Sequence, residues 1–321
     1  MDSSNINNFN MDQIHSLMNL LNSVKVEKER TKKTLESFCT EYENYIEGEC
    51  SQKYYKSVKL SMNALRKYFS DDIDINELTV KMIEDFIINL KINAPKGYRV
   101  YYRNLKAAFN KALDWDYISS NPFVKIKLRK QQEEHPQTID ASELSLIMNS
   151  IKQQQIKDIV FTSFYTGCRL SEIINLRWNN IDLVNNIITV GDEMFSTKSR
   201  KQRQIPICEK LSEKLQGIDP ASNGEIVNLN SYVFGKSRTI AFNADYVSRQ
   251  FKKASRAVGL EEKVKFHSLR HSFASNLVKA GVDLYIVKEL LGHSSITVTE
   301  RYSHLKIETL IKNIEVLNNA A

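Results

Sequence analysis

Apolar residues recur at three- and four-residue intervals along most of this chain, the spacing of helices that bury one face. The pattern is clearest between residues 34 and 128, where Val58, Met62, Leu65 and Phe69 form one such set. Glycine and proline, which interrupt helices, number only 10 and 5 in 321 residues. The sequence therefore predicts a mainly α fold.

A polar segment interrupts this helical pattern. Residues 131–137 contain Pro136 and have no apolar period, so we expect them to link two domains. The first would be a compact helical domain at 34–130, preceded by a partly helical N-terminal extension at 1–33. The second domain is expected at 138–321, and each domain is long enough to bury a core of its own.

The charge balance is basic, with a formal net charge of +7 and a pI near 9.0. This balance favours an acidic partner. Nucleic acid is expected rather than a membrane surface, because no lipid-binding segment stands out. The four cysteines form no C-x-x-C pair, which argues against a disulfide framework or a zinc knuckle. No signal peptide or membrane-spanning run is apparent, so we expect a cytoplasmic protein with reduced thiols.

The last long helix expected in the first domain carries four cations on one face. They are spaced three, four and three residues apart and are Lys96, Arg99, Arg103 and Lys106. Either a surface that contacts phosphates or a solvated cationic face accounts for them.

Two β-prone runs, NIITV and RQIPIC, lie in the second domain on either side of the segment STKSRKQ. They add a small β-hairpin or sheet to the mainly α fold. The turn between them is strongly basic, with Lys198, Arg200 and Lys201, and is a second candidate for contact with nucleic acid.

Residues 265–304 hold four of the six histidines. His267 and His271 have the i, i+4 spacing of a zinc pair, but no acidic residue completes that pattern, and Arg270 would place a positive charge beside the ion. A site for a negatively charged group instead accounts for the arginines, the histidines and the tyrosine together. Arginine grips two phosphate oxygens, histidine moves a proton near neutral pH, and tyrosine can attack phosphorus.

Three motifs in this order resemble the tyrosine recombinase, or phage integrase, family. They are TGCRLSEIINLRW at 166–178, HSLRHSFAS at 267–275 and LLGHSSITVTERYSHL at 290–305. The resemblance covers the whole second domain and, more loosely, the first. It implies a two-domain tyrosine recombinase architecture, with a helical core-binding (SAM-like) DNA-binding domain and a catalytic domain that ends in a C-terminal helix.

The resemblance also implies a role for each matching residue. Arg169 and Arg270 correspond to the pair that binds the scissile phosphate, and His293 to a further donor to it. Tyr302 corresponds to the nucleophile, whose proton His267 is expected to receive. Ordinary tyrosine has a pKa of about 10, so such an attack needs a proton acceptor and a cationic setting.

The remaining matches concern supporting groups. Lys198 corresponds to the hairpin lysine that protonates the leaving 5′ oxygen, with Lys201 as the rival because the turn is rich in cations. Glu172 resembles an acidic residue that orients an arginine or histidine. The family pattern gives His271 and His304 no catalytic duty, so we expect both to be structural.

The implied function is site-specific cleavage and rejoining of DNA through a 3′-phosphotyrosyl intermediate and a Holliday junction, without metal, ATP or another cofactor. The implied partners are double-stranded DNA with specific recombination sites and a homotetramer on synapsed DNA. A mobile-element integrase and a chromosome or plasmid dimer resolvase both fit. A non-catalytic DNA-binding protein on the same fold and a type IB topoisomerase are the alternatives.

The tail after the nucleophile carries an apolar stripe. Its members are Leu310, Ile311, Ile314 and Leu317. The resemblance implies a helix that docks on a neighbouring protomer, and packing on its own domain is the alternative.

Overall fold

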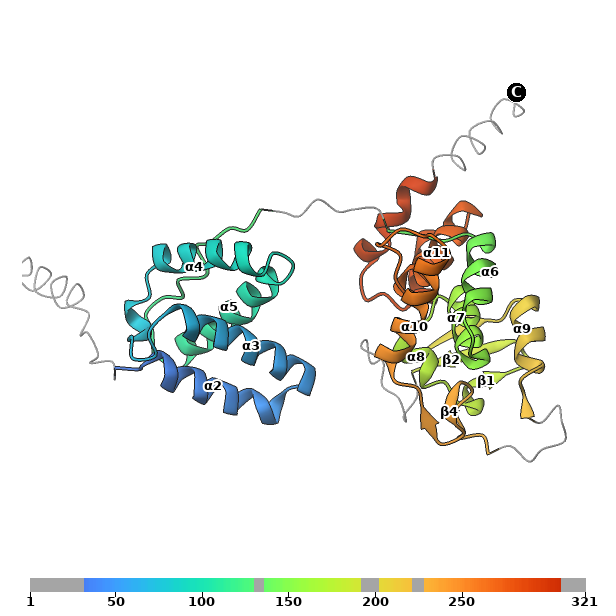
Figure 1. The fold of residues 1–321 in the computed structure, drawn as a ribbon, viewed down its shortest axis with the longest axis horizontal. Helices are drawn as coiled ribbons and strands as arrows, with labels where there is room; N and C mark the ends of the chain where they lie inside the picture. The colour runs from blue at the N-terminus through green and yellow to red at the C-terminus, as the bar shows by residue number, and fades with distance from the viewer. Residues whose placement is uncertain (1–31, 130–135, 192–201, 221–227, 307–321) are drawn as a thin grey trace, which may run out of the picture. The chain divides into compact units, whose positions relative to one another are not determined.

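The computed structural model describes residues 32–129, 136–191, 202–220 and 228–306. Contacts between Cα atoms divide the chain into two compact units, Met1–Gln131 and Gln132–Ala321. Helices dominate both units and the strands are short (Figure 1), which confirms the predicted mainly α fold with a small sheet.

Several sequence-based expectations fall outside the described residues. They concern nearly all of the 1–33 extension, the three hairpin cations Lys198, Arg200 and Lys201, and the apolar stripe of the tail.

The first unit is a bundle of α2 (Leu35–Glu49), α3 (Gln52–Tyr68), α4 (Val80–Asn93) and α5 (Tyr98–Asp114). The hydroxyl groups of Thr34, Ser51 and Thr79 accept hydrogen bonds from backbone N–H groups and begin α2, α3 and α4. The predicted apolar spacing forms the core, in which Phe38 and Phe109 meet edge to face with ring centroids 5.3 Å apart.

The second unit contains seven α-helices among the described residues. They are α6 (Ala141–Ser150), α7 (Gln154–Thr166), α8 (Leu170–Ile174), α9 (Glu209–Gln216), α10 (Ala244–Ala257), α11 (His267–Lys279) and α12 (Leu284–Leu291). Two 3₁₀ segments, η4 (Ile296–Val298) and η5 (Glu300–Lys306), follow α12.

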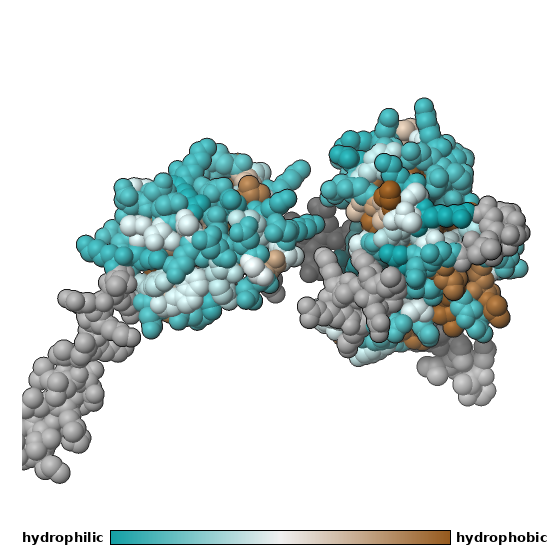
Figure 2. Space-filling model, turned by 90° about the horizontal axis from the view of Figure 1, so that it is seen from below, coloured by the Kyte–Doolittle hydropathy of each residue, from teal (hydrophilic) through white to brown (hydrophobic). Residues whose placement is uncertain are grey.

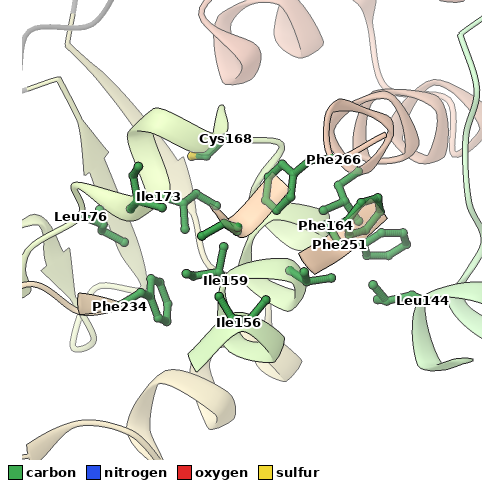
Figure 3. Packing of buried hydrophobic residues seen from close by; sticks show 14 of the residues in the cluster. Leu144, Ile156, Ile159, Phe164, Cys168, Ile173, Leu176, Phe234, Phe251 and Phe266 are labelled. Atoms are coloured by element: carbon green, nitrogen blue, oxygen red, sulfur yellow. The ribbon is translucent and has the colours of Figure 1, made fainter. Parts of the chain in front are cut away.

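The main core of the second unit gathers around α7. Ile156 and Ile159 of α7 lie among side chains from other segments, including Phe251 and Phe266 (Figure 3). Cys168, the residue before Arg169, belongs to the same buried cluster. The start of α8 is therefore anchored to the core.

The predicted hairpin runs form part of a three-stranded antiparallel sheet with the order β1 (Ile181–Asp182), β2 (Ile187–Val190) and β3 (Arg203–Pro206). In the β2–β3 register, Val190 is paired with Arg203. A second sheet, β4 (Gly235–Ser237) with β5 (Ile240–Ala241), was not expected from the sequence. Strands of two or three residues are too short to show an alternating pattern.

A smaller cluster of buried residues joins α11, α12 and η5 near the C-terminal end of the described chain. Its members are Ala274, Val278, Val287, Leu291 and Tyr302. Within the described ranges no helix is long and apolar enough to cross a membrane. Hydrophilic side chains cover most of the face shown in Figure 2.

Candidate active site

Glu172 fixes Arg169 at the start of α8. One carboxylate oxygen accepts from the Arg169 backbone N–H at 2.8 Å, and the other accepts from the Arg169 guanidinium at 2.8 Å. The Glu172 side chain is buried, whereas the Arg169 side chain is 25% exposed. The first arginine of the site is thus held at its base and retains access to solvent.

Gly167 makes the sharp turn between α7 and α8 possible. Its φ is +64°, a left-handed conformation that side chains disfavour. A Cβ atom at this position would also lie 2.4 Å from Cδ1 of Phe273 and 3.0 Å from a methyl carbon of Leu291. A glycine is therefore required where the chain turns into Arg169.

Arg270 lies on α11 and is only 2% exposed. Its guanidinium donates to the Gly167 carbonyl at 2.7 Å and to the Leu291 carbonyl at 2.6 Å. Burial, with the charge of Arg169, lowers the pKa of Arg270 to about 10, so the group is charged at neutral pH.

The C-terminus of α12 brings the guanidinium groups together. The carbonyl of Leu290 accepts from Arg203 at 2.9 Å, that of Leu291 from Arg270 at 2.6 Å, and that of Gly292 from Arg169 at 3.4 Å. These last carbonyls have no partner within the helix and carry the negative end of its dipole. They therefore favour a cluster of positive charge.

His293 follows this helix end directly. Gly292 has a φ of +65°, so the chain turns sharply before the histidine. The Nδ1 atom of His293 lies 2.8 Å from the hydroxyl oxygen of Thr299, which is fully buried. This contact fixes the ring and leaves Nε2 for another partner.

Tyr302 is 2% exposed within the cluster formed by α11, α12 and η5. Its hydroxyl oxygen lies 2.5 Å from Nδ1 of His271. Burial raises the pKa of Tyr302 to about 12, although the charges of Arg270 and Arg301 oppose that rise. In this state the tyrosine is protonated and covered.

The structure pairs His271, which the sequence pattern gave a structural place, with the hydroxyl of Tyr302. His267 and His271 are one helical turn apart on α11, and their rings meet edge to face at 4.7 Å. His271, one turn further along α11, contacts Tyr302 of η5. His267 instead lines a pocket of about 270 Å³ together with Lys265 and Arg270.

The three histidines of the site are neutral at pH 7. Burial, reinforced by the charges of Arg270 and Arg169, lowers the pKa of His267 to about 4. Burial is also the main cause that lowers the pKa values of His271 and His293 to about 3. Neutral imidazoles can accept a proton from tyrosine.

The four cations expected on one face of the first unit all lie in or just before α5. Lys96 and Arg103 are exposed. Arg99 and Lys106 are half-buried and lie over the rings of Tyr98 and Tyr102 respectively. The Arg99 guanidinium also donates to the carbonyl of Arg129 at 2.5 Å.

Comparison with known families identifies the family to which the chain belongs. Residues 137–308 match the model of the phage integrase family, and residues 33–128 match that of the phage integrase SAM-like domain. The chain belongs to the phage integrase family. It is a tyrosine-type site-specific recombinase, as the three sequence motifs indicated.

Curated relatives and solved structures agree with this assignment. The chain is 31% identical to the tyrosine recombinase XerD of Lacticaseibacillus casei over 60% of this chain and 67% of the relative. It is 27% identical to XerC of Pediococcus pentosaceus over 83% and 91% of the two chains.

Two solved integrases share the fold. The Tn1549 transposon integrase in complex with transposon right end DNA has a TM-score of 0.72 at 21% identity, covering 89% of this chain and 100% of that one. A lambda integrase tetramer bound to a Holliday junction gives 0.68 at 20% identity, covering 89% and 87%. The predicted two-domain architecture of a tyrosine recombinase is confirmed.

Two contacts of the candidate site were not expected from the sequence of this recombinase: that of Arg203 with Glu172 and α12, and that of His271 with Tyr302. Arg203 follows a segment that is rich in cations, and only the tertiary structure brings it to α12. The signal for His271 was its place in the run of histidines, which does not say which ring meets the tyrosine. In the part of the chain that the structure describes, no three His, Cys, Asp or Glu side chains gather closely enough to hold a metal ion.

Proposed function

We propose that this recombinase cuts double-stranded DNA at specific sites through a 3′-phosphotyrosyl intermediate. The phenol oxygen of Tyr302 bonds to the scissile phosphorus, and the bond from phosphorus to the 5′ oxygen breaks. The tyrosine proton passes to an imidazole, and the leaving 5′ oxygen takes a proton from Lys198, with Lys201 as the rival donor. The observation that carries the proposal is the convergence of Arg169, Arg270 and His293 on the C-terminus of α12.

Fixed positive charge is what such a reaction needs. Negative charge builds on the phosphoryl oxygens in the transition state, and donors that are already oriented stabilise it without reorganisation. Arg270 is oriented by two carbonyl groups and Arg169 by Glu172. These guanidiniums fill the part that a metal ion plays in many phosphoryl transfers, so the proposed reaction uses neither metal nor ATP.

His293 serves as a donor to the phosphate in this proposal. When the Thr299 hydroxyl donates to Nδ1, the proton of the neutral ring lies on Nε2. That nitrogen can then donate to a phosphoryl oxygen. Since the ring is neutral, its contribution is a directed hydrogen bond rather than a full charge.

Tyr302 has to change its surroundings before it attacks. The buried hydroxyl is bound to His271, so DNA binding must shift η5 to bring the oxygen to the phosphate. We propose that His271 holds Tyr302 in this buried position before DNA binds. His267, which shares a pocket with Arg270, is the proton acceptor once the tyrosine moves.

The pH dependence of cleavage follows from the lowered pKa of His267, which is about 4. Above that pH the ring is neutral and accepts a proton, and below it the protonated ring does not. The rate at DNA concentrations below the Kd reports the free protein and should therefore be flat between about pH 6 and pH 8. An acid limb with its midpoint near 6.5, the ordinary pKa of histidine, would contradict this assignment.

After cleavage, the phosphotyrosyl ester keeps the energy of the broken linkage. A 5′ hydroxyl from a second strand can attack it and reseal the backbone. Exchange of strands between two sites then passes through a Holliday junction on a tetramer of this chain. The solved lambda integrase tetramer on such a junction, which shares the fold, supports this assembly.

Two exposed cations, Lys96 just before α5 and Arg103 on α5, are proposed to contact DNA phosphates. Replacing Lys96 and Arg103 with alanine should weaken binding to specific and unrelated DNA alike and lower the salt slope of log K by about one unit per lost contact. Titrations at several salt concentrations measure this slope. Lys53→Ala with Lys56→Ala, exposed lysines of α3, is the matched control, and an unchanged slope in the α5 variant would reject the contacts.

A nicked DNA substrate tests the main proposal. Once the strand is cut, the short fragment beside the nick diffuses away and the covalent complex cannot reseal. A complex that survives a denaturing gel without added metal is the expected result. If none forms on DNA flanking the gene or on chromosomal dimer-resolution sites, a non-catalytic DNA-binding protein on this fold is the better description.

A further inference from the structure

Arg203 is the arginine of strand β3, and each of its three side-chain nitrogens donates a hydrogen bond within the protein. The side chain is 8% exposed. Nε donates to the Leu290 carbonyl at 2.9 Å, while the two terminal nitrogens donate to Glu172 at 3.1 and 2.7 Å. Arg169, in contrast, is partly exposed and has donors left for a ligand. Arg203 is therefore placed to hold other groups rather than to bind substrate.

Glu172 is shared equally between the two arginines. Its Oε1 accepts from the guanidiniums of Arg169 and Arg203, and its Oε2 accepts from the Arg169 backbone N–H and from Arg203. A carboxylate has about four acceptor sites, so this one is saturated. Without Arg203, Glu172 would be balanced by Arg169 alone and free to draw that guanidinium into a two-pronged pair.

The electrostatics of Glu172 depend on the same contact. Burial works to raise the pKa of Glu172, but the hydrogen bonds and charges of Arg203 and, to a smaller extent, Arg169 together hold the pKa below its ordinary value. Burial opposes charge on Arg203 as well, and its hydrogen bond to Glu172 is what raises its pKa. Each of the two buried groups therefore favours the charged form of the other.

Gly292 provides an independent link between Arg203 and the turn that carries His293. A Cβ atom at position 292 would lie 3.0 to 3.2 Å from three atoms of Arg203: Cδ, Nη1 and Nε. That is tighter than ordinary contact, so the backbone of the turn and the Arg203 side chain are packed directly together. Gly292 therefore allows the sharp turn before His293 and also leaves room for the Arg203 side chain.

We propose that Arg203 is a positioning residue for DNA cleavage, which sets Arg169 through Glu172 and sets the turn of His293 through the end of α12. The inference rests on the proposed function, because it assigns Arg169 and His293 to the scissile phosphate. Arg203 ties three segments of the site, namely β3, the start of α8 and the end of α12, at one buried point.

The test compares Arg203→Lys and Arg203→Met in single-turnover cleavage of a nicked substrate at saturating DNA. Lysine keeps the charge but cannot donate along three directions in one plane. We expect cleavage to slow by about 10-fold in Arg203→Lys and about 100-fold in Arg203→Met, the range typical of residues that orient a catalytic group. The Kd for DNA, measured by mobility shift, should stay within about twofold of the wild type.

Two comparisons separate positioning from general damage. Arg177→Lys alters another half-buried arginine of the same unit, which donates to Tyr232 and lies over its ring, and should cleave at the wild-type rate. In the double variant Glu172→Gln with Arg203→Met, cleavage should be no slower than in the slower single variant, because both act in one network. Thermal melting of each variant shows whether it is folded.

Several results would overturn the inference. These are normal cleavage by a folded Arg203→Met, a slower reaction explained entirely by weaker DNA binding, or losses that multiply in the double variant. Wild-type protein in the same experiment distinguishes failure of the proposed function from failure of the Arg203 inference alone. No covalent complex with the wild type rejects the proposed function and removes the basis for Arg203, whereas normal cleavage by Arg203→Met rejects the positioning role alone.

Discussion

Replacing Tyr302 with phenylalanine should abolish the covalent protein–DNA complex and leave DNA binding intact. The change removes one oxygen atom, the proposed nucleophile, from a buried ring. Loss of a nucleophile costs many orders of magnitude, so cleavage should fall by more than about 10⁴-fold, to background. A nicked substrate on a denaturing gel measures the complex, and a mobility shift measures binding.

The control for this variant is Tyr285→Phe. Tyr285 lies on the neighbouring helix α12 and is 65% exposed, so its hydroxyl has no part in the buried cluster. It should form the complex at the wild-type rate. A complex of normal yield with Tyr302→Phe would remove Tyr302 as the nucleophile, and mapping the linked peptide would then identify the residue that attacks.

Replacing Arg270 with alanine has the second largest expected effect. Arg270 is buried and held by the carbonyls of Gly167 and Leu291, so its charge is aimed in a fixed direction. Removing one such preorganised donor costs about 10² to 10³ in the rate of the chemical step. Arg270→Lys should recover part of this loss, because it keeps the charge but not the planar fork.

Folding has to be checked beside the rate, since Arg270→Ala leaves two buried carbonyls without a partner. Arg270→Lys serves here too, because its ammonium group can still satisfy one of them. Lys279→Ala, an exposed cation at the end of the same helix, controls for the loss of one positive charge. Wild-type cleavage by a folded Arg270→Ala would show that the phosphate is bound elsewhere.

The sequence predicted the helical elements well because their patterns are local. Apolar spacing gave the bundle at 34–128, and the β-prone runs on either side of the basic segment gave β2 and β3. The motif residues Arg169, Arg270 and His293 could be named because the family keeps them at fixed places along the chain. Each of these signals is contained in a short stretch of residues.

What the sequence could not predict depends on distant contacts. Arg203 and Leu290 are 87 residues apart, and nothing local indicates that one donates to the other. The choice between His267 and His271 as partner of Tyr302 depends on where η5 packs against α11, a matter of one helical turn. The β4–β5 sheet was missed because its strands are too short to carry a pattern.

The three arginines that meet at the end of α12 come from segments spread over about a hundred residues, Arg169 to Arg270. The same helix covers Tyr302, through Val287 and Leu291. Regions with few buried apolar contacts are among those that open in local fluctuations. A fluctuation that frees Tyr302 by lifting α12 also scatters the guanidiniums that would activate a phosphate. If Tyr302 is the nucleophile, as proposed, we therefore expect the protein away from its target to cleave DNA poorly even when it opens locally.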